Sequence, residues 1–163
     1  MSKSPKKILV TGVAGFLGSH LAEKLAEMKH KVIGVDNMMG GYEDNIPKNI
    51  EFFNFDCCDL DKMKRVTKGV DVVYHCAATA HEGLSVFSPY EITKNNHLAS
   101  VSVFSASVSN KVKRIIFCSS MARYGDQQTP FTEDMIPKPV DPYAISKVAS
   151  ESVLINLCEL NNI

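Results

Sequence analysis

The chain has 163 residues, of which 45% are hydrophobic, and this is the size and composition of one packed domain rather than of a disordered polymer. Its 18 Lys and Arg residues balance 18 Asp and Glu residues, so no net positive field is available to hold a nucleic acid or an anionic membrane surface. The sequence contains no apolar stretch of transmembrane length and no signal-peptide pattern, so we expect a cytoplasmic protein that binds neither nucleic acid nor membrane.

Short apolar runs alternate with helical stretches along the whole chain, a pattern typical of βαβ units around a parallel sheet. The first run, residues 7–11, is continuous and β-branched, as expected for a strand that is buried on both faces. In chain order we then expect a helix at 16–29, a strand at 32–35, a loop at 38–48, a strand at 51–55, a helix at 61–68 and a strand at 71–76. These elements predict an α/β fold with a doubly wound parallel sheet.

The stretch that follows, residues 89–110, is ambiguous because Ser and Val alternate at 100–103 with the period of a strand. Parallel neighbouring strands need a crossover of about a dozen residues or more, and 89–110 is the only material available between the fourth strand and the next one. We therefore expect a helix at 89–110, followed by a fifth strand at 114–119, a loop at 126–141 and a last helix at 142–160.

A glycine-rich turn joins the first expected strand to the first expected helix. Gly12 permits the tight turn, Gly15 lets the backbone approach a diphosphate, and Gly18 allows the helix to pack closely on the strand. The diphosphate would rest on free N–H groups at the N-terminus of the helix. A turn with a purely structural role is the alternative, but the strand and helix on either side favour a dinucleotide site.

An acidic residue, Asp36, ends the second strand, where its carboxylate can accept hydrogen bonds from the ribose hydroxyls of adenosine. No Lys or Arg follows at once to receive a 2′-phosphate, because Asn37, Met38 and Met39 come next. The sequence therefore favours NAD over NADP.

A second constellation combines a phenol, an ammonium group and a hydroxyl. Tyr143 and Lys147 lie at i and i+4, on one face of the last helix, and a nearby positive charge stabilises a phenolate. Ser120 follows the fifth strand, at the carboxyl edge of the sheet where open α/β folds bind ligands. We predict these three as the catalytic residues, with a simple solvated Tyr/Lys pair as the alternative.

Motifs along the whole chain carry a family resemblance. They are Thr11-Gly12-x-x-Gly15-x-x-Gly18, Asp36-Asn37, Asp56, His75-x-Ala77-Ala78, Ser119-Ser120-x-x-x-Tyr124-Gly125 and Pro142-Tyr143-x-x-x-Lys147. In order and spacing they resemble the extended short-chain dehydrogenase/reductase family, in particular its UDP-galactose 4-epimerase-like branch of nucleotide-sugar epimerases and dehydratases. The resemblance implies an NAD-binding Rossmann domain over residues 1–163.

The resemblance also implies roles for particular residues. Asp56 would meet the adenine amino group with Cys57 beside it, Ala77 and Ala78 would line the cofactor after the fourth strand, and Asn96 would lie near the active site. The full cofactor set implied is Gly12, Gly15, Phe16, Leu17, Gly18, Asp36, Asn37, Asp56, Cys57, Ala77, Ala78, Asn96, Tyr143 and Lys147.

The reaction implied is reversible oxidation of a nucleotide sugar, most simply a UDP-sugar. The dehydratases of this branch carry an Asp-Glu pair after the active-site threonine, whereas Met121-Ala122 follow Ser120 here, which disfavours elimination of water. By resemblance to the epimerases, Tyr143 would take the proton of the C4 hydroxyl while hydride passes to NAD. The 4-keto sugar would then turn over and receive hydride on its other face.

Family members continue beyond the last expected helix into a sixth strand and a C-terminal substrate-binding region. In the usual strand order 3-2-1-4-5-6, the fifth strand would otherwise lie at an unprotected edge. We therefore expect this chain to be the cofactor-binding part of an epimerase, with little turnover by itself. The alternative is a non-catalytic NAD-binding module. We also expect a homodimer through the helices at 89–110 and 142–160, or a partner that completes the sheet edge.

Two residue types invite simpler interpretations. The five cysteines form no C-x-x-C pair, which favours free thiols and no metal site, and Cys118 is interpreted as a small buried residue of the core. His75 lies within an apolar run and is predicted to be a hydrogen-bonded core histidine rather than a ligand or a base.

Overall fold

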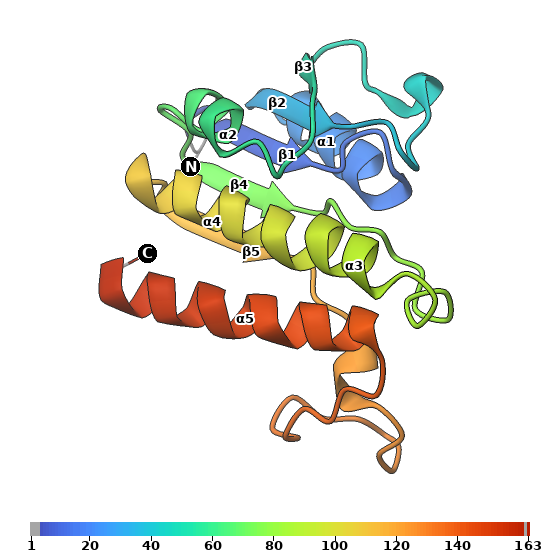
Figure 1. Cartoon of the computed structure of the whole chain (residues 1–163). Coiled ribbons are helices and arrows are strands. Elements are labelled where there is room, and N and C mark those ends of the chain that lie inside the picture. The colour runs from blue at the N-terminus through green and yellow to red at the C-terminus, as the bar shows by residue number, and fades with distance from the viewer. Residues whose placement is uncertain (1–3, 162) are drawn as a thin grey trace.

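A single parallel sheet organises the chain, for which the computed structural model describes residues 4–161 and 163. Its strands are β1 (Lys7–Thr11), β2 (Lys31–Asp36), β3 (Glu51–Asn54), β4 (Val72–His75) and β5 (Arg114–Phe117). They lie in the order β3-β2-β1-β4-β5 (Figure 1). All neighbouring pairs are parallel, so the predicted doubly wound α/β architecture is confirmed.

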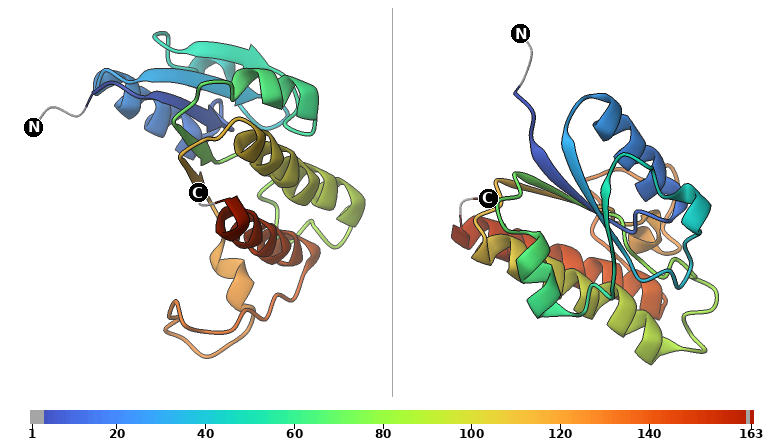
Figure 2. Two further views of the ribbon diagram at one scale, coloured as in Figure 1. Left: turned by 90° about the vertical axis from the view of Figure 1, so that its left-hand side faces the viewer. Right: turned by 90° about the horizontal axis from the view of Figure 1, so that it is seen from above.

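Helices cover both faces of the sheet. Helix α1 (Phe16–Glu27) lies on one face, and α2 (Leu60–Val66), α4 (Ala99–Ser109) and α5 (Pro142–Asn161) lie on the other (Figures 1 and 2). Successive residues of β1 point in opposite directions, so Ile8 and Val10 pack against α1 while Leu9 packs into the cluster on the far side. This two-sided burial explains why the strands read as continuous apolar runs. Among the described residues, no helix is both long enough and apolar enough to cross a bilayer.

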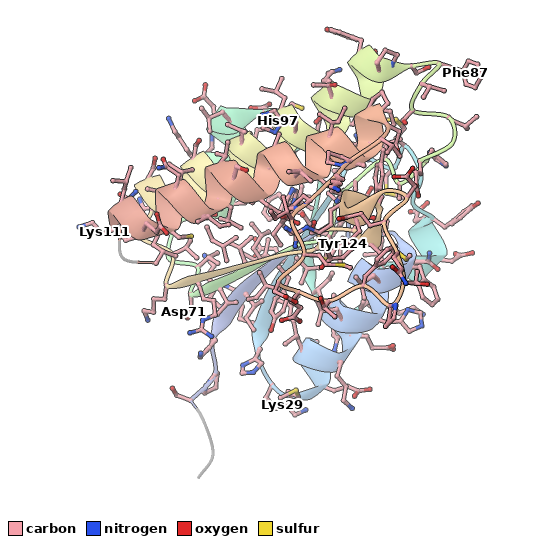
Figure 3. The ribbon with its side chains drawn as sticks, turned by 90° about the horizontal axis from the view of Figure 1, so that it is seen from below. Lys29, Asp71, Phe87, His97, Lys111 and Tyr124 are labelled. Carbon is pink, nitrogen blue, oxygen red and sulfur yellow. The ribbon has the colours of Figure 1, made fainter. Side chains whose placement is uncertain are left out.

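The ambiguous stretch at 89–110 is helical, as the crossover argument predicts. It consists of α3 (Pro89–Ile92), a π-helical segment η2 (Thr93–Leu98) and α4. In Figure 3 the labelled residues Phe87 and Lys111 lie near the two ends of this continuous helical stretch. The π segment was not predicted, and neither were two short 3₁₀ turns, η1 (Glu43–Asn45) and η3 (Met121–Tyr124). The first lies in the loop expected at 38–48, and the second lies between the expected fifth strand and the loop expected at 126–141.

A buried hydrogen-bond chain ties β4 to β1 and α4. His75 is only 1% exposed; its Nδ1 lies 2.6 Å from Thr11 Oγ1 and its Nε2 2.9 Å from Ser100 Oγ. The Ser100 hydroxyl donates to the Asn96 carbonyl oxygen, so it accepts from His75, and the proton of the imidazole resides on Nε2. Nδ1 then accepts from the Thr11 hydroxyl. His75 is therefore the hydrogen-bonded core histidine that the sequence predicts.

This histidine should make the fold acid-sensitive. Burial lowers the pKa of His75 to about 3, well below the ordinary value of about 6.5 that applies in the unfolded chain. Between these values the unfolded state binds one more proton than the folded state, so stability falls as the pH falls. At pH 5 the loss relative to pH 7 is expected to be about 2 kcal/mol, measurable by urea unfolding at both pH values.

The substitution His75→Gln keeps a donor toward Ser100 but removes the titrating group, and should abolish most of this pH dependence. His20→Gln, which removes an exposed histidine from α1, is the matched control. Equal pH dependence in the His75→Gln variant and the wild type would contradict the assignment.

Candidate active site

A pocket of about 310 Å³ lies at the carboxyl edge of the sheet, where the loops after β1, β2, β3 and β4 converge. Open α/β sheets bind ligands at this edge. The pocket brings together eight of the predicted cofactor residues, namely Gly12, Gly15, Asp36, Asn37, Asp56, Cys57, Ala77 and Ala78. Residues that are far apart in the sequence therefore form one surface.

The glycine-rich turn leaves no space for side chains at two of its positions. Gly12 has a φ of +72°, and a Cβ atom there would lie 2.7 Å from the Ala77 nitrogen. A Cβ on Gly18 would overlap the Gly12 carbonyl oxygen. Gly15 is the N-cap of α1 and caps it with no side chain, so the first N–H groups of the helix remain available to an anion. This backbone cradle fits the diphosphate of a dinucleotide.

Asp36 is held in place by the backbone around it. Its Oδ2 accepts from the Ala14 N–H at 3.0 Å, and its Oδ1 accepts from the Met38 N–H at 2.8 Å. The second bond closes a tight turn in which Met38 takes a left-handed φ of +63°. The carboxylate is 8% exposed, lines the pocket, and links the end of β2 to the glycine turn.

Two further loops complete the wall of the pocket. Asp56, after β3, accepts from the Cys58 N–H at 2.8 Å. Burial raises the pKa of the adjacent Cys57 thiol, which keeps it neutral. On the other side, Asn37 accepts from the Met39 N–H at 3.1 Å and orders the start of the loop after β2.

Asn96 positions the pocket wall rather than lining it. This residue is 2% exposed, accepts from the Thr79 N–H at 2.7 Å and donates to the Thr79 carbonyl oxygen at 3.2 Å. The Asn95 side-chain amide also donates to the Thr79 hydroxyl oxygen at 3.3 Å. Asn95 and Asn96, two consecutive residues of the π-helical segment, therefore contact the same residue of the loop after β4.

The predicted catalytic residues lie beside the pocket, on the first turns of α5 and after β5. Lys147 is 3% exposed and donates to the Cys118 carbonyl oxygen at 2.9 Å, with its Nζ 5.8 Å from the centroid of the Tyr143 ring. Burial lowers the pKa of Lys147 to about 8. Tyr143 packs in a buried cluster with Ala122, two residues after Ser120. The Tyr143/Lys147 pair is therefore buried rather than solvated, and its catalytic role stays a prediction.

Polar contacts of Glu151, which were not predicted from the sequence, hold α5 against the segment after β5. Glu151, one turn after Lys147, accepts a hydrogen bond from the Ser119 hydroxyl and forms an ion pair with Arg123 at 3.0 Å. The Arg123 and Glu151 side chains are only 25% and 16% exposed. No local pattern in the sequence links Glu151 to Ser119 or Arg123, because these contacts join segments that are far apart in the chain.

Some predicted cofactor residues lie away from the pocket lining. Phe16 and Leu17, in the first turn of α1, are 83% and 54% exposed and do not line the pocket. Conversely, the lining includes residues that were not predicted as cofactor residues, namely Met39, Gly40, Gly41, Cys76, Thr79, Ala80, His81, Asn95 and Ala99. Two consecutive glycines, Gly40 and Gly41, were a sequence signal for a close backbone approach in this loop. The structure shows the approach, because a Cβ on Gly41 would lie 2.6 Å from the Ala14 Cβ.

Known proteins share this arrangement. A UDP-glucose 4-epimerase from Streptomyces lividans is 34% identical over 152 residues, which are 91% of this chain and 46% of that protein. The structure of the UDP-glucose 4-epimerase of Thermotoga maritima with UDP-glucose matches with a TM-score of 0.93 and 34% identity, over 96% of this chain and 52% of that one. The corresponding enzyme of Thermus thermophilus, in complex with NAD, matches with a TM-score of 0.91 and 32% identity over 96% and 52%.

The chain spans about half the length of the relatives that it matches. A family model described as the NAD dependent epimerase/dehydratase family matches residues 8–163. That match covers nearly all of the sheet and the pocket described above, and with it the resemblance inferred from the motifs is confirmed: the chain belongs to the NAD dependent epimerase/dehydratase family.

Proposed function

We propose that this chain binds NAD and forms the coenzyme half of a nucleotide-sugar 4-epimerase. The observation that supports this proposal is that the pocket and the predicted catalytic residues lie side by side at the carboxyl edge of the sheet. The glycine cradle and Asp36 line the pocket, and Cys76 of the same pocket lies 3.6 Å from Cys118, whose carbonyl oxygen holds Lys147. A coenzyme in the pocket would therefore extend toward Tyr143 and Lys147.

The residues present fit this coenzyme. The N–H groups at the start of α1 would hold the diphosphate, Asp36 the adenosine ribose, and Asp56 with Cys57 the adenine. The small side chains of Ala77 and Ala78 leave room in the pocket for the nicotinamide part of the coenzyme. Asn96 holds this side of the pocket in place through its hydrogen bond with Thr79. When bound, NAD supplies a reversible hydride acceptor.

The chain's own residues would handle the proton. Tyr143 would accept the proton of the sugar hydroxyl, and the Lys147 ammonium group would stabilise the negative charge on the phenol oxygen. Ser120 would share a hydrogen bond with the same hydroxyl group. Since the Ser120 hydroxyl accepts from the Ala122 N–H at 3.2 Å, its proton remains free to be donated.

The substrate that we propose is a UDP-sugar. The support comes from the relatives, which are UDP-glucose 4-epimerases, one of them solved with UDP-glucose. Because the chain spans about half of each relative, we further propose that the sugar nucleotide contacts residues of a C-terminal region beyond this chain, and that the chain alone turns over little substrate.

Coenzyme binding can be measured on the chain itself. By isothermal titration calorimetry we expect NAD to bind more tightly than NADP, whose 2′-phosphate would meet the Asp36 carboxylate. Asp36→Asn should weaken NAD binding roughly 10-fold and narrow the preference over NADP, since an amide cannot accept from both the Ala14 and Met38 N–H groups. Asp44→Asn, an exposed acid on η1, is the control. Absence of heat with NAD would overturn the proposal.

We also propose a cytoplasmic homodimer. The helices expected to pair carry exposed apolar side chains on their outer faces, among them Tyr90, Leu98, Ile145 and Ile155. A pair of helices from each protomer would cover these side chains in a four-helix bundle. Sedimentation velocity should give the mass of two chains, and a monomer mass at micromolar concentration would refute the dimer.

A further inference from the structure

Two cysteine thiols face each other at the ends of the two neighbouring strands β4 and β5. His75 pairs with Phe117 in the parallel register, so the residues that follow, Cys76 and Cys118, lie opposite one another. Their Sγ atoms are 3.6 Å apart, and both residues are partly exposed. Cys118 is therefore not the fully buried core residue that the sequence suggested.

The positions suit a disulfide. Neighbouring strands lie about 4.8 Å apart, within the range of about 4.4–6.8 Å that Cα atoms span in disulfides. The two sulfur atoms would have to approach by roughly 1.5 Å to form the bond. No other pair of cysteine thiols forms a contact of this kind among the described residues.

The surroundings make the two thiols unequal. The hydrogen bond shared with Cys76 lowers the pKa of Cys118 to about 6, against the opposing effect of burial, and the charge of Lys147 lowers the pKa of both thiols. The same hydrogen bond, together with burial, raises the pKa of Cys76. Cys118 therefore loses its proton more readily than Cys76, and a thiolate is the nucleophilic form.

We propose that Cys76 and Cys118 form a peroxide-sensitive dithiol beside the coenzyme pocket, in which Cys118 attacks the oxidant and Cys76 resolves the product. The facing thiols support this oxidation whether or not the chain takes part in the epimerase reaction. Because Cys76 lines the pocket and the Cys118 carbonyl oxygen anchors Lys147, the bond would form between the two parts of the proposed site.

The oxidant is a hydroperoxide, here hydrogen peroxide. The Cys118 thiolate attacks one peroxide oxygen, an S–O bond forms, the O–O bond breaks, and the departing hydroxide takes a proton to become water. The Cys76 thiol then attacks the sulfur of the Cys118 sulfenic acid, an S–S bond forms, the S–O bond breaks, and the oxygen leaves as water with the thiol proton. In sum, two thiols lose two electrons and two protons, and the peroxide is reduced to two waters.

To test this proposal, the 163-residue protein is treated with one equivalent of hydrogen peroxide in the absence of reductant. We expect titratable thiols to fall from five to three, the intact mass to fall by two hydrogens, and peptide mapping to find the Cys76–Cys118 crosslink. Dithiothreitol should restore all five thiols. Peptide mapping of the wild type needs no variant, so a folding defect in a variant cannot mask the outcome.

Variants separate the two roles. Cys76→Ser should stop at a Cys118 sulfenic acid that dimedone traps, and Cys118→Ser should lower the rate of thiol loss at least about 10-fold. Cys158→Ser, a partly exposed cysteine on α5, is the matched control and should form the crosslink at the wild-type rate. A crosslink between other cysteines, sulfinic acid without a crosslink, or undiminished thiol loss in Cys118→Ser would overturn the proposal.

Discussion

Replacing Gly12 by alanine is expected to weaken NAD binding by roughly 100-fold, which corresponds to about 2.7 kcal/mol. Two effects act together at this position. The φ of +72° is a conformation that costs an L-residue about 1 kcal/mol. The new Cβ would also lie 2.7–2.9 Å from three backbone atoms at the end of β4, the Ala77 nitrogen and Cα and the Cys76 carbonyl carbon. None of these can rotate away as a side chain would.

The turn or the end of β4 must therefore shift, and both line the pocket. The shift would move the N–H groups that are expected to hold the diphosphate, so affinity falls even where the fold survives. Calorimetry with NAD measures the loss, and a thermal melt of the same variant separates it from unfolding. Gly83→Ala is the control, because a Cβ there meets nothing within 4 Å. Wild-type affinity in Gly12→Ala would show that the coenzyme does not lie on this turn.

Local patterns were enough to predict the strands and the glycine-rich turn after β1. A strand buried on both faces is a continuous apolar run, and Leu9 with its neighbours shows why, since they pack into clusters on opposite sides of the sheet. Gly12 and Gly18 could be assigned because their backbone requirement excludes every other residue. The helix at 89–110 followed from topology, which overrode a misleading period of two in the sequence.

Contacts between distant segments were not predictable in the same way. Asn96 was expected near the cofactor, but its partner Thr79 lies in the loop after β4, 17 residues away in the sequence, and no local pattern pairs the two. Glu151 has no local signal for its contacts with Ser119 and Arg123 after β5. Cys118 looked like a core residue because a strand pattern shows that a side chain is apolar, not which thiol lies opposite.

The second large effect concerns Tyr143, and it requires a protein that can turn over sugar. A fusion of this chain with the C-terminal half of the Thermotoga maritima epimerase spans the full length of that relative, and the backbones match with a TM-score of 0.93 over 96% of this chain. We expect this fusion to interconvert UDP-glucose and UDP-galactose. In the fusion, Tyr143→Phe should lower the rate by about 10²–10⁴-fold, the usual contribution of a general acid–base group.

The size of this effect follows from what phenylalanine keeps and what it lacks. Its ring preserves the packing with Ile92, Ala122 and Ala144, so the fold should survive, whereas the proton acceptor near Lys147 is lost. NAD affinity should fall only several-fold, since one hydroxyl contributes about 1 kcal/mol. Tyr90→Phe removes a hydroxyl from a 75% exposed tyrosine and is the control. A Tyr143→Phe fusion that keeps its rate would exclude this phenol as the base, and a silent wild-type fusion that still binds NAD would instead favour a non-catalytic coenzyme-binding module.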